Sequence, residues 1–279
     1  MSSDKIETTE KIDMAEGMRK GIYILPNLFT TGSLFAGFYG IVSTTNGKYD
    51  VAALWILVAS IFDGLDGKVA RLTGTSSKFG VEYDSLADLV AFGVAPGILM
   101  YCWALKPFGR LGWLAAFLFV VCGALRLARF NVQVNTVESK RFVGLPIPAA
   151  ASMVSATVLL FHHFGWPGSF KKLAILLLIY LLAFLMVSNF RYYSFKDPSI
   201  IKRQPFVFLV LAILLLIVIA AEPVLMLFSI FICYIFSGPV AYIMTYPRRR
   251  RLKKLLQTNI PKHQQEGELL QQQEQVIGF

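Results

Sequence analysis

Long apolar runs, separated by short polar connections, make up most of the chain. A helix that crosses the roughly 30 Å hydrocarbon core of a bilayer needs about 20 residues. Eight runs are long enough or nearly so: residues 28–46, 51–72, 81–104, 111–130, 146–164, 173–190, 205–221 and 224–245. No soluble domain fits in the connections between them. The pattern therefore predicts an all-α fold, a polytopic membrane helix bundle with about eight transmembrane helices.

Composition and charge support a membrane protein. Hydrophobic residues make up 56% of the chain and charged residues 16%, whereas soluble domains carry about 25% charged residues. The net charge of +10 would suit a nucleic-acid partner. The basic residues, however, flank the apolar runs and gather near the C-terminal end, which is typical of membrane proteins. We therefore expect membrane lipid as a partner and no nucleic acid.

The basic residues also predict the orientation in the membrane. With eight spans, both termini lie on one side, together with the loops near 71–80, 131–145 and 191–204. Of the 27 Lys and Arg, all lie on this side except Lys48, Lys106, Arg110, Lys171 and Lys172. By the positive-inside rule this side is cytoplasmic. The first 20 residues lack the pattern of a signal peptide, so we expect the first apolar run to be retained as a helix. The sequence therefore predicts a multi-pass protein of the cell inner (cytoplasmic) membrane with both termini in the cytoplasm.

Four aspartates, Asp63, Asp66, Asp84 and Asp88, lie within or at the edge of these apolar helices. A carboxylate at membrane depth is costly unless it has a partner or faces water. At 100° per residue, Asp63 and Asp66 share one face of the second helix, and Asp84 and Asp88 share one face of the third. Because a short loop joins the two helices on the predicted cytoplasmic side, we expect all four carboxylates to converge near that leaflet.

Convergent carboxylates repel one another unless protons or cations lie between them. Two divalent ions cancel four negative charges, and oxygen ligands suit Mg²⁺ or Mn²⁺. Such a two-metal site fits phosphoryl chemistry. Gly67, Ala70 and Gly80 lie on the same faces and leave room for a substrate, and Arg71 is placed to contact a diphosphate.

An aspartate within a membrane helix can also serve packing, proton transfer, proteolysis or transport, and each role predicts a different sequence. A helix-packing role or a proton pathway needs one or two such residues rather than four. An intramembrane aspartyl protease needs two catalytic aspartates and gives no reason for the neighbouring Gly, Ala and Arg. A carboxylate-lined transporter would more often show related halves or broken helices in corresponding positions, and the sequence shows neither.

The spacing Asp-x₂-Asp-Gly-x₂-Ala-Arg-x₈-Gly-x₃-Asp-x₃-Asp, from Asp63 to Asp88, resembles without a departure the motif of the CDP-alcohol phosphatidyltransferase family. The resemblance implies a six-helix membrane core with its active site facing the cytoplasm. It also implies that the four aspartates bind two metal ions and that Asp88 is in addition the base. The CDP pocket would be lined by Gly67, Ala70, Arg71 and Gly80.

The resemblance covers about residues 20–190. It implies a cytoplasmic N-terminal segment at 1–22, the catalytic core at 23–190, an additional helix pair at 191–246 and a basic, then Gln-rich, cytoplasmic tail at 247–279. The added helices would either cover a lipid-facing surface or extend a dimer interface. A homodimer is what the resemblance to the family implies.

Further stretches, at residues 26–30, 124–131 and 142–148, resemble the phosphatidylserine synthase branch of this family. The implied reaction is transfer of the phosphatidyl group from CDP-diacylglycerol to L-serine, with release of CMP. The nearest alternative is a sister enzyme that uses glycerol 3-phosphate, inositol phosphate or choline.

Serine carries a carboxylate, so a selective pocket should contain a cation. The candidates are Arg126 and Arg129, at the predicted cytoplasmic end of the fourth helix, with Asn131 as a further polar contact. Before the first helix, Asn27 and Thr30 either contact the nucleotide or cap that helix.

Overall fold

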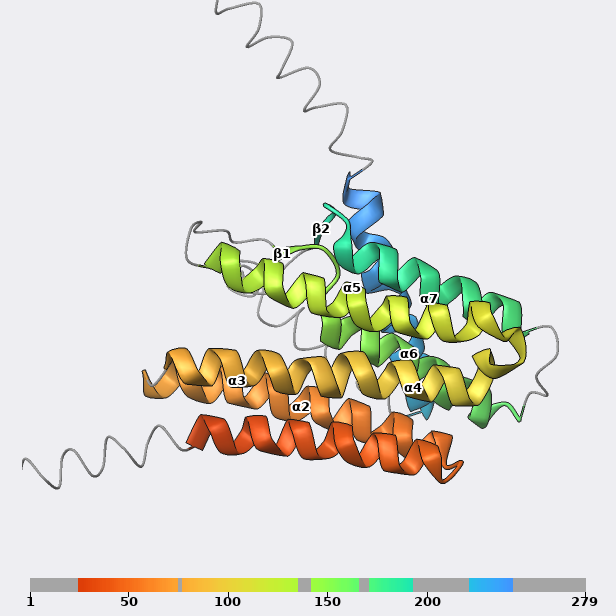
Figure 1. Ribbon diagram of the computed structural model, residues 1–279, viewed down its shortest axis with the longest axis horizontal. Helices are drawn as coiled ribbons and strands as arrows, with labels where there is room; N and C mark the ends of the chain where they lie inside the picture. Colours follow the sequence, from red (N-terminus) through yellow and green to blue (C-terminus); the bar gives the residue numbers. More distant parts are fainter. Residues whose placement is uncertain (1–24, 75–76, 135–141, 166–170, 193–220, 243–279) are drawn as a thin grey trace, which may run out of the picture.

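The structure is a computed structural model that describes residues 25–74, 77–134, 142–165, 171–192 and 221–242. In this part of the chain, long helices lie side by side in a bundle (Figure 1). A first helix covers residues 25–45 and a last helix covers Pro223–Tyr242. Between them lie α2 (Tyr49–Thr73), α3 (Lys78–Asp88), α4 (Ala95–Met100), α5 (Arg110–Val134), α6 (Ile147–His163) and α7 (Lys171–Val187). The predicted helical membrane bundle is confirmed.

Seven of the eight predicted spans coincide with these helices to within a few residues. The remaining prediction, 205–221, lies almost wholly outside the described residues, as do the terminal segments 1–22 and 247–279. Within the described residues, three helices are long and apolar enough to cross a membrane: Lys78–Phe108, Arg110–Val132 and Pro223–Tyr242. Shorter apolar helices lie at Ile147–His163 and Leu173–Val187. The protein is therefore a polytopic membrane helical protein, and the total of eight spans stays a prediction.

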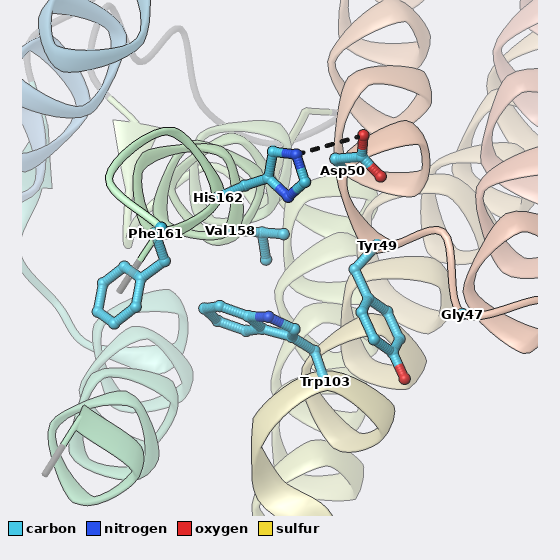
Figure 2. Close-up of a pocket in the computed structure, with 8 residues that line it drawn as sticks. Gly47, Tyr49, Asp50, Trp103, Val158, Phe161 and His162 are labelled. Carbon is cyan, nitrogen blue, oxygen red and sulfur yellow. Dashed lines mark ion pairs between the residues drawn. The ribbon is translucent and has the colours of Figure 1, made fainter. Parts of the chain in front are cut away.

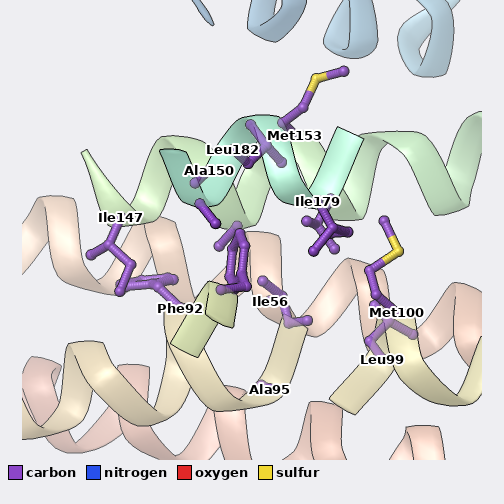
Figure 3. Close-up of a cluster of buried hydrophobic side chains, with 14 of the residues drawn as sticks. Ile56, Phe92, Ala95, Leu99, Met100, Ile147, Ala150, Met153, Ile179 and Leu182 are labelled. Atoms are coloured by element: carbon purple, nitrogen blue, oxygen red, sulfur yellow. The ribbon is translucent and has the colours of Figure 1, made fainter. Parts of the chain in front are cut away.

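Small residues allow the helices to pack closely. A Cβ atom on Gly37 would lie 2.5 Å from Cα of Ala91, so the first helix and the third meet at their backbones. Close approach of this kind drives helix association in a bilayer, where apolar burial gives no advantage over lipid. Larger side chains from α2, α4, α6 and α7 fill the centre of the bundle (Figure 3). Many large apolar side chains, such as Phe35, Phe117 and Phe184, are exposed on its outside, as lipid contact requires.

The third predicted span is less regular than its hydropathy pattern indicates. After α3 the helix widens into a π-helical segment, η1 (Leu89–Val94), and after α4 into a second, η2 (Tyr101–Leu105). The N–H of Ala95 donates to the carbonyl of Val90, five residues back. Pro96 has no N–H, and its ring would clash with the carbonyl four residues back in a regular helix, so the wider turn before it relieves that conflict. The span predicted at 81–104 thus lies within one helical stretch, Lys78–Phe108, and the two widened turns in it were not predicted.

The C-terminal ends of α2, α5 and α7 lie at one end of the bundle (Figure 1). The chain leaves α2 through Gly74, whose φ of 64° is left-handed and whose N–H bonds to the carbonyl of Ala70. Two short antiparallel strands, β1 (Phe142–Val143) and β2 (Arg191–Tyr192), join the connection after α5 to the one after α7. The strands were not predicted, and the placement of the loops near 71–80, 131–145 and 191–204 on one side of the membrane stays a prediction.

Candidate active site

Three of the four predicted carboxylates meet between α2 and α3. One oxygen each from Asp63, Asp66 and Asp84 lies within 4.8 Å of the other two. Two oxygens on opposite sides of a single Mg²⁺ ion are about 4 Å apart. The three side chains therefore need little adjustment to share a divalent cation. We call Asp63, Asp66, Asp84 and Asp88 the acidic cluster.

Asp88 joins the acidic cluster through Asp63. The carboxyl groups of Asp63 and Asp88 lie close together, and Asp88 is only 8% exposed. Two carboxyl groups in contact need a proton or a cation between them. Over the described ranges, no Lys or Arg nitrogen forms an ion pair with the cluster. The ion pairs found in these ranges lie elsewhere and join His162 to Asp50 and His163 to Glu222. Among the described residues, the cluster thus has no directly paired cation, and its oxygen donors fit divalent metal ions.

The first helix supports the acidic cluster from one side. The hydroxyl of Thr30 donates to Oδ2 of Asp66 at 3.0 Å, and the hydroxyls of Thr31 and Tyr83 lie 2.9 Å apart. Thr30 therefore orients a carboxylate. Asn27 and Thr30 both lie inside the helix at residues 25–45, so the alternative that they cap its start was wrong.

The small residues of the motif have different surroundings. At Gly67, a Cβ atom would meet only Nη2 of Arg71, at 3.9 Å, and Nε of Arg71 donates to the Gly67 carbonyl at 2.7 Å. At Gly80, a Cβ atom would lie 3.2 Å from Oγ of Ser77 and 3.3 Å from Oδ1 of Asn27. The face of α2 that carries Gly67, Arg71 and the partly exposed Ala70 is thus open to a ligand, whereas Gly80 gives space for contact with the first helix and the cap of α3.

The predicted serine-binding residues are separated by the fold. Arg126 is 9% exposed and interacts electrostatically with Asp88 and Asp63. Arg129 instead donates to Oδ1 of Asn189 at 2.7 Å. Asn131 donates to Oγ of Ser85 at 2.9 Å, which ties α5 to α3. Of the two arginines, only Arg126 faces the acidic cluster.

One neighbour of Arg126 was not predicted from the sequence. Tyr234, on the last helix, lies near the Arg126 guanidinium. Nothing in the local sequence marks this tyrosine, because it is separated from the motif by more than half of the chain. A search for polar residues within the late apolar runs would have selected it as a candidate.

A cavity of about 390 Å³ lies at the other end of α2, lined by Gly47, Tyr49, Asp50, Trp103, Val158, Phe161, His162 and Gly165 (Figure 2). Nε2 of His162 lies 3.8 Å from Oδ2 of Asp50, and both side chains are well exposed. At 1.5 Å per residue, Asp50 and Asp63 are about 20 Å apart along the helix. This cavity contains none of the residues that the sequence predicted for the site.

Comparison with known proteins places the chain in a family. The family model described as CDP-alcohol phosphatidyltransferase matches residues 23–235, which extends beyond the core boundary predicted at 190. A CDP-diacylglycerol--serine O-phosphatidyltransferase of Helicobacter pylori is 51% identical over 177 residues, covering 63% of this chain and 74% of that protein. One of Mycobacterium leprae is 32% identical over 225 residues, covering 79% and 75%. An archaetidylserine synthase of Methanothermobacter thermautotrophicus is 38% identical over 170 residues, covering 60% and 69%.

Proposed function

The chain belongs to the CDP-alcohol phosphatidyltransferase family, and from that premise we propose that it transfers the phosphatidyl group of CDP-diacylglycerol to the hydroxyl of L-serine, releasing CMP and forming phosphatidylserine. The observation that carries the proposal is the convergence of the motif carboxylates into one acidic cluster. The choice of serine is supported by the printed names of the relatives, two of which are serine O-phosphatidyltransferases.

The acidic cluster would hold two divalent metal ions, Mg²⁺ or Mn²⁺, through Asp63, Asp66, Asp84 and Asp88. When bound, such ions neutralise the diphosphate and stabilise the charge on the attacking and leaving oxygens. Thr30 keeps Asp66 in the orientation that a ligand needs, as its hydrogen bond suggests.

The protein side chains then have separate roles. Asp88 accepts the proton of the serine hydroxyl, and the serine oxygen attacks the phosphorus that bears the diacylglycerol. The bond from that phosphorus to the CMP oxygen breaks, and CMP leaves with the electron pair. Arg71, beside the open face at Gly67, donates to the phosphate of the departing CMP. Ala70, Gly80 and Asn27 complete the CDP pocket.

Arg126 would hold the carboxylate of serine. Two divalent ions cancel the four charges of the acidic cluster, which leaves the buried Arg126 as surplus positive charge beside Asp88. An acceptor whose hydroxyl faces Asp88 can place its own carboxylate on this guanidinium. Arg129 and Asn131, which have protein partners in Asn189 and Ser85, would act at the rim of the pocket.

The distribution of basic residues gives the expected setting of the enzyme. We expect the acidic cluster and both termini to face the cytoplasm, in the inner membrane, because most basic residues fall at that end. Residues 23–190 would form the catalytic core and 191–246 an added helix pair, in a homodimer.

The test is an assay of the purified protein in detergent with CDP-diacylglycerol and either Mg²⁺ or Mn²⁺. The acceptors are L-serine, glycerol 3-phosphate, inositol phosphate and choline, and CMP release and the lipid product are measured for each. We expect CMP release with serine alone, its loss on chelation with EDTA, and its return on addition of metal. Faster release with another acceptor would replace serine in the proposal, and release that persists in EDTA would refute the metal site.

A further inference from the structure

Helix α3 carries two members of the acidic cluster, Asp84 and Asp88, although much of its surface is uncovered. The side chains of Phe79 and Leu86 are 70% and 64% exposed, and Glu82, which lies between them in the sequence, is exposed as well. At 100° per residue, these three residues lie on the face of α3 that is turned away from Asp84. Protein packing on that face therefore does not fix how far α3 is rotated about its axis.

The first helix is hydrogen-bonded to α3 at the residue directly before Asp84. The hydroxyl of Thr31 donates to the carbonyl of Asn27 at 2.8 Å, so the Thr31 oxygen remains as an acceptor. The hydroxyl of Tyr83 lies 2.9 Å from this oxygen and is therefore the donor. This bond fixes one side of α3 to the first helix.

Helix α5 is hydrogen-bonded to α3 at the residue directly after Asp84. The hydroxyl of Ser85 donates to the carbonyl of Val81 at 3.0 Å, and its oxygen accepts from Nδ2 of Asn131 at 2.9 Å. Asn131 lies one turn beyond the buried Leu127, so it continues the face of α5 that is turned into the bundle. On both sides of α3, a hydroxyl that is bonded to its own helix thus accepts from a side chain of the other helix.

The two interhelical hydrogen bonds lie on opposite sides of Asp84. Tyr83 and Ser85 are each rotated by about 100° from it, in opposite directions. A rotation of α3 in either direction therefore has to lengthen one of the two bonds. Such a rotation would also move the carboxylate of Asp84, which has an oxygen within 4.8 Å of oxygens of Asp63 and Asp66.

We propose that the hydrogen bonds Tyr83–Thr31 and Asn131–Ser85 form a clamp that holds Asp84 at the spacing that a divalent cation requires. The four residues of the clamp are positioning residues, because they act through Asp84 and do not contact the reacting atoms. This role rests on the proposed function, in which Asp84 is a metal ligand. At the rim of the pocket, Asn131 then holds α3 and does not contact serine.

The experiment measures the binding of Mn²⁺ to the full-length chain in detergent by electron paramagnetic resonance, without substrates. Tyr83→Phe and Ser85→Ala each remove one bond of the clamp, and each should raise the Kd for Mn²⁺ at least about fivefold. Loss of a group that bonds to a metal ligand directly costs about 10–100-fold in metal affinity, and the clamp acts one step further away. Ser85→Thr keeps the accepting oxygen and should stay within about twofold of the unaltered protein.

Two variants elsewhere in the bundle serve as matched controls. Ser229→Ala removes a hydroxyl that, like that of Ser85, donates to the carbonyl four residues back, at 2.8 Å. Tyr180→Phe removes a hydroxyl that donates to the carbonyl of Leu111 at 3.4 Å and so joins α7 to α5. Leu111 is about 30 Å from Asn131 along α5, which places this bond far from the acidic cluster. Both controls should keep the Kd for Mn²⁺ within about twofold of that of the unaltered protein.

A double variant separates the clamp from direct contact with serine. Asn131→Ala and Ser85→Ala remove the same hydrogen bond, so together they should raise the Kd for Mn²⁺ by less than twofold over the larger single effect. If Asn131 contacted serine, Asn131→Ala would raise KM for serine and leave the Kd for Mn²⁺ unchanged, while Ser85→Ala would change neither.

That pattern would overturn the clamp, as would unchanged Mn²⁺ affinity in Tyr83→Phe and Ser85→Ala, or an equal loss of affinity in the two controls. The Kd does not depend on the folded fraction, so partial misfolding would not imitate the expected result. Lack of serine turnover by the unaltered protein would overturn the proposed function, and the Mn²⁺ affinities would still test the clamp.

Discussion

The two ends of α2 carry carboxylates in opposite circumstances. Near its start, Asp50 lies 3.8 Å from Nε2 of His162, and the two side chains are 38% and 68% exposed. In its second half, Asp66 is 5% exposed, accepts a hydrogen bond from Thr30 and lies among other carboxylates. An exposed carboxylate with a partner contributes little beyond solubility. A buried carboxylate without a paired cation is costly, and such a residue is typical of a site that binds an ion or a substrate.

The cavity at the first end and the acidic cluster at the second also differ in what they offer. The cavity of about 390 Å³ is lined by Tyr49, Trp103 and Phe161 beside the Asp50–His162 pair. The acidic cluster offers oxygen ligands, a buried guanidinium and an open face of α2. We therefore expect the chemistry at the clustered carboxylates rather than at the cavity.

The largest loss is expected for Asp66→Asn. The change would remove a proposed metal ligand and put an amide in its place. Turnover should therefore fall by at least about 10⁴-fold, as loss of several kcal/mol of transition-state stabilisation implies. CMP release is measured across a range of Mn²⁺ concentrations. Because Mn²⁺ is paramagnetic, its binding can be followed independently by electron paramagnetic resonance, and the affinity should also fall. Full activity with unchanged Mn²⁺ binding would contradict a metal role for the acidic cluster.

Asp88→Asn should separate the base from the other ligands. Loss of a general base costs about 10²–10⁴-fold, and Asp63, Asp66 and Asp84 remain to hold metal. We expect turnover to fall in this range while CDP-diacylglycerol still binds, as measured by protection against thermal unfolding in detergent. Retained turnover in Asp88→Asn would refute the assignment of Asp88 as base.

A smaller effect is expected at the two arginines of α5, which the structure places in different surroundings. Lys keeps the charge but loses the planar donor fork. Arg126→Lys should raise KM for serine about 10-fold with little change for CDP-diacylglycerol, because Arg126 faces the acidic cluster. Arg129→Lys should change either value by less than about threefold, because Arg129 bonds to Asn189 at the rim. The reverse order would move the serine pocket to Arg129.

These arginines also illustrate the limits of prediction from sequence. Periodicity predicted the helices, and fixed spacing predicted that the aspartates of α2 and α3 would converge, because both follow from 100° per residue and a short loop. Arg126 and Arg129 are three residues apart, and which of them faces the site depends on how α5 is rotated against its neighbours. That rotation is set by packing across the bundle, which no local pattern encodes.

Two other features depend on long-range structure in the same way. The widening of the helix after Asp88 has a local signal in Pro96, which a helix assignment based on hydropathy passes over. The position of the last helix has none, because it depends on the hydrogen bond from Tyr192 to the carbonyl of Ile235 and on the close approach of Gly238 to the Tyr192 ring. The residues with the clearest chemistry were thus predictable, and those that orient them were not.

The smallest effect is expected for Asp50→Asn, at the opposite end of α2. An exposed ion pair contributes about 0–1 kcal/mol, so the midpoint of thermal unfolding in detergent should shift by no more than a few degrees. The acidic cluster is about 20 Å away along the helix, so kcat and both KM values should stay within about twofold of the unaltered protein. His162→Gln, which removes the other partner of the same pair, should give the same result. A tenfold loss of turnover in either variant would show that an exposed, paired carboxylate in this bundle affects the reaction. Burial among other carboxylates would then no longer distinguish the proposed catalytic end of α2 from the other end.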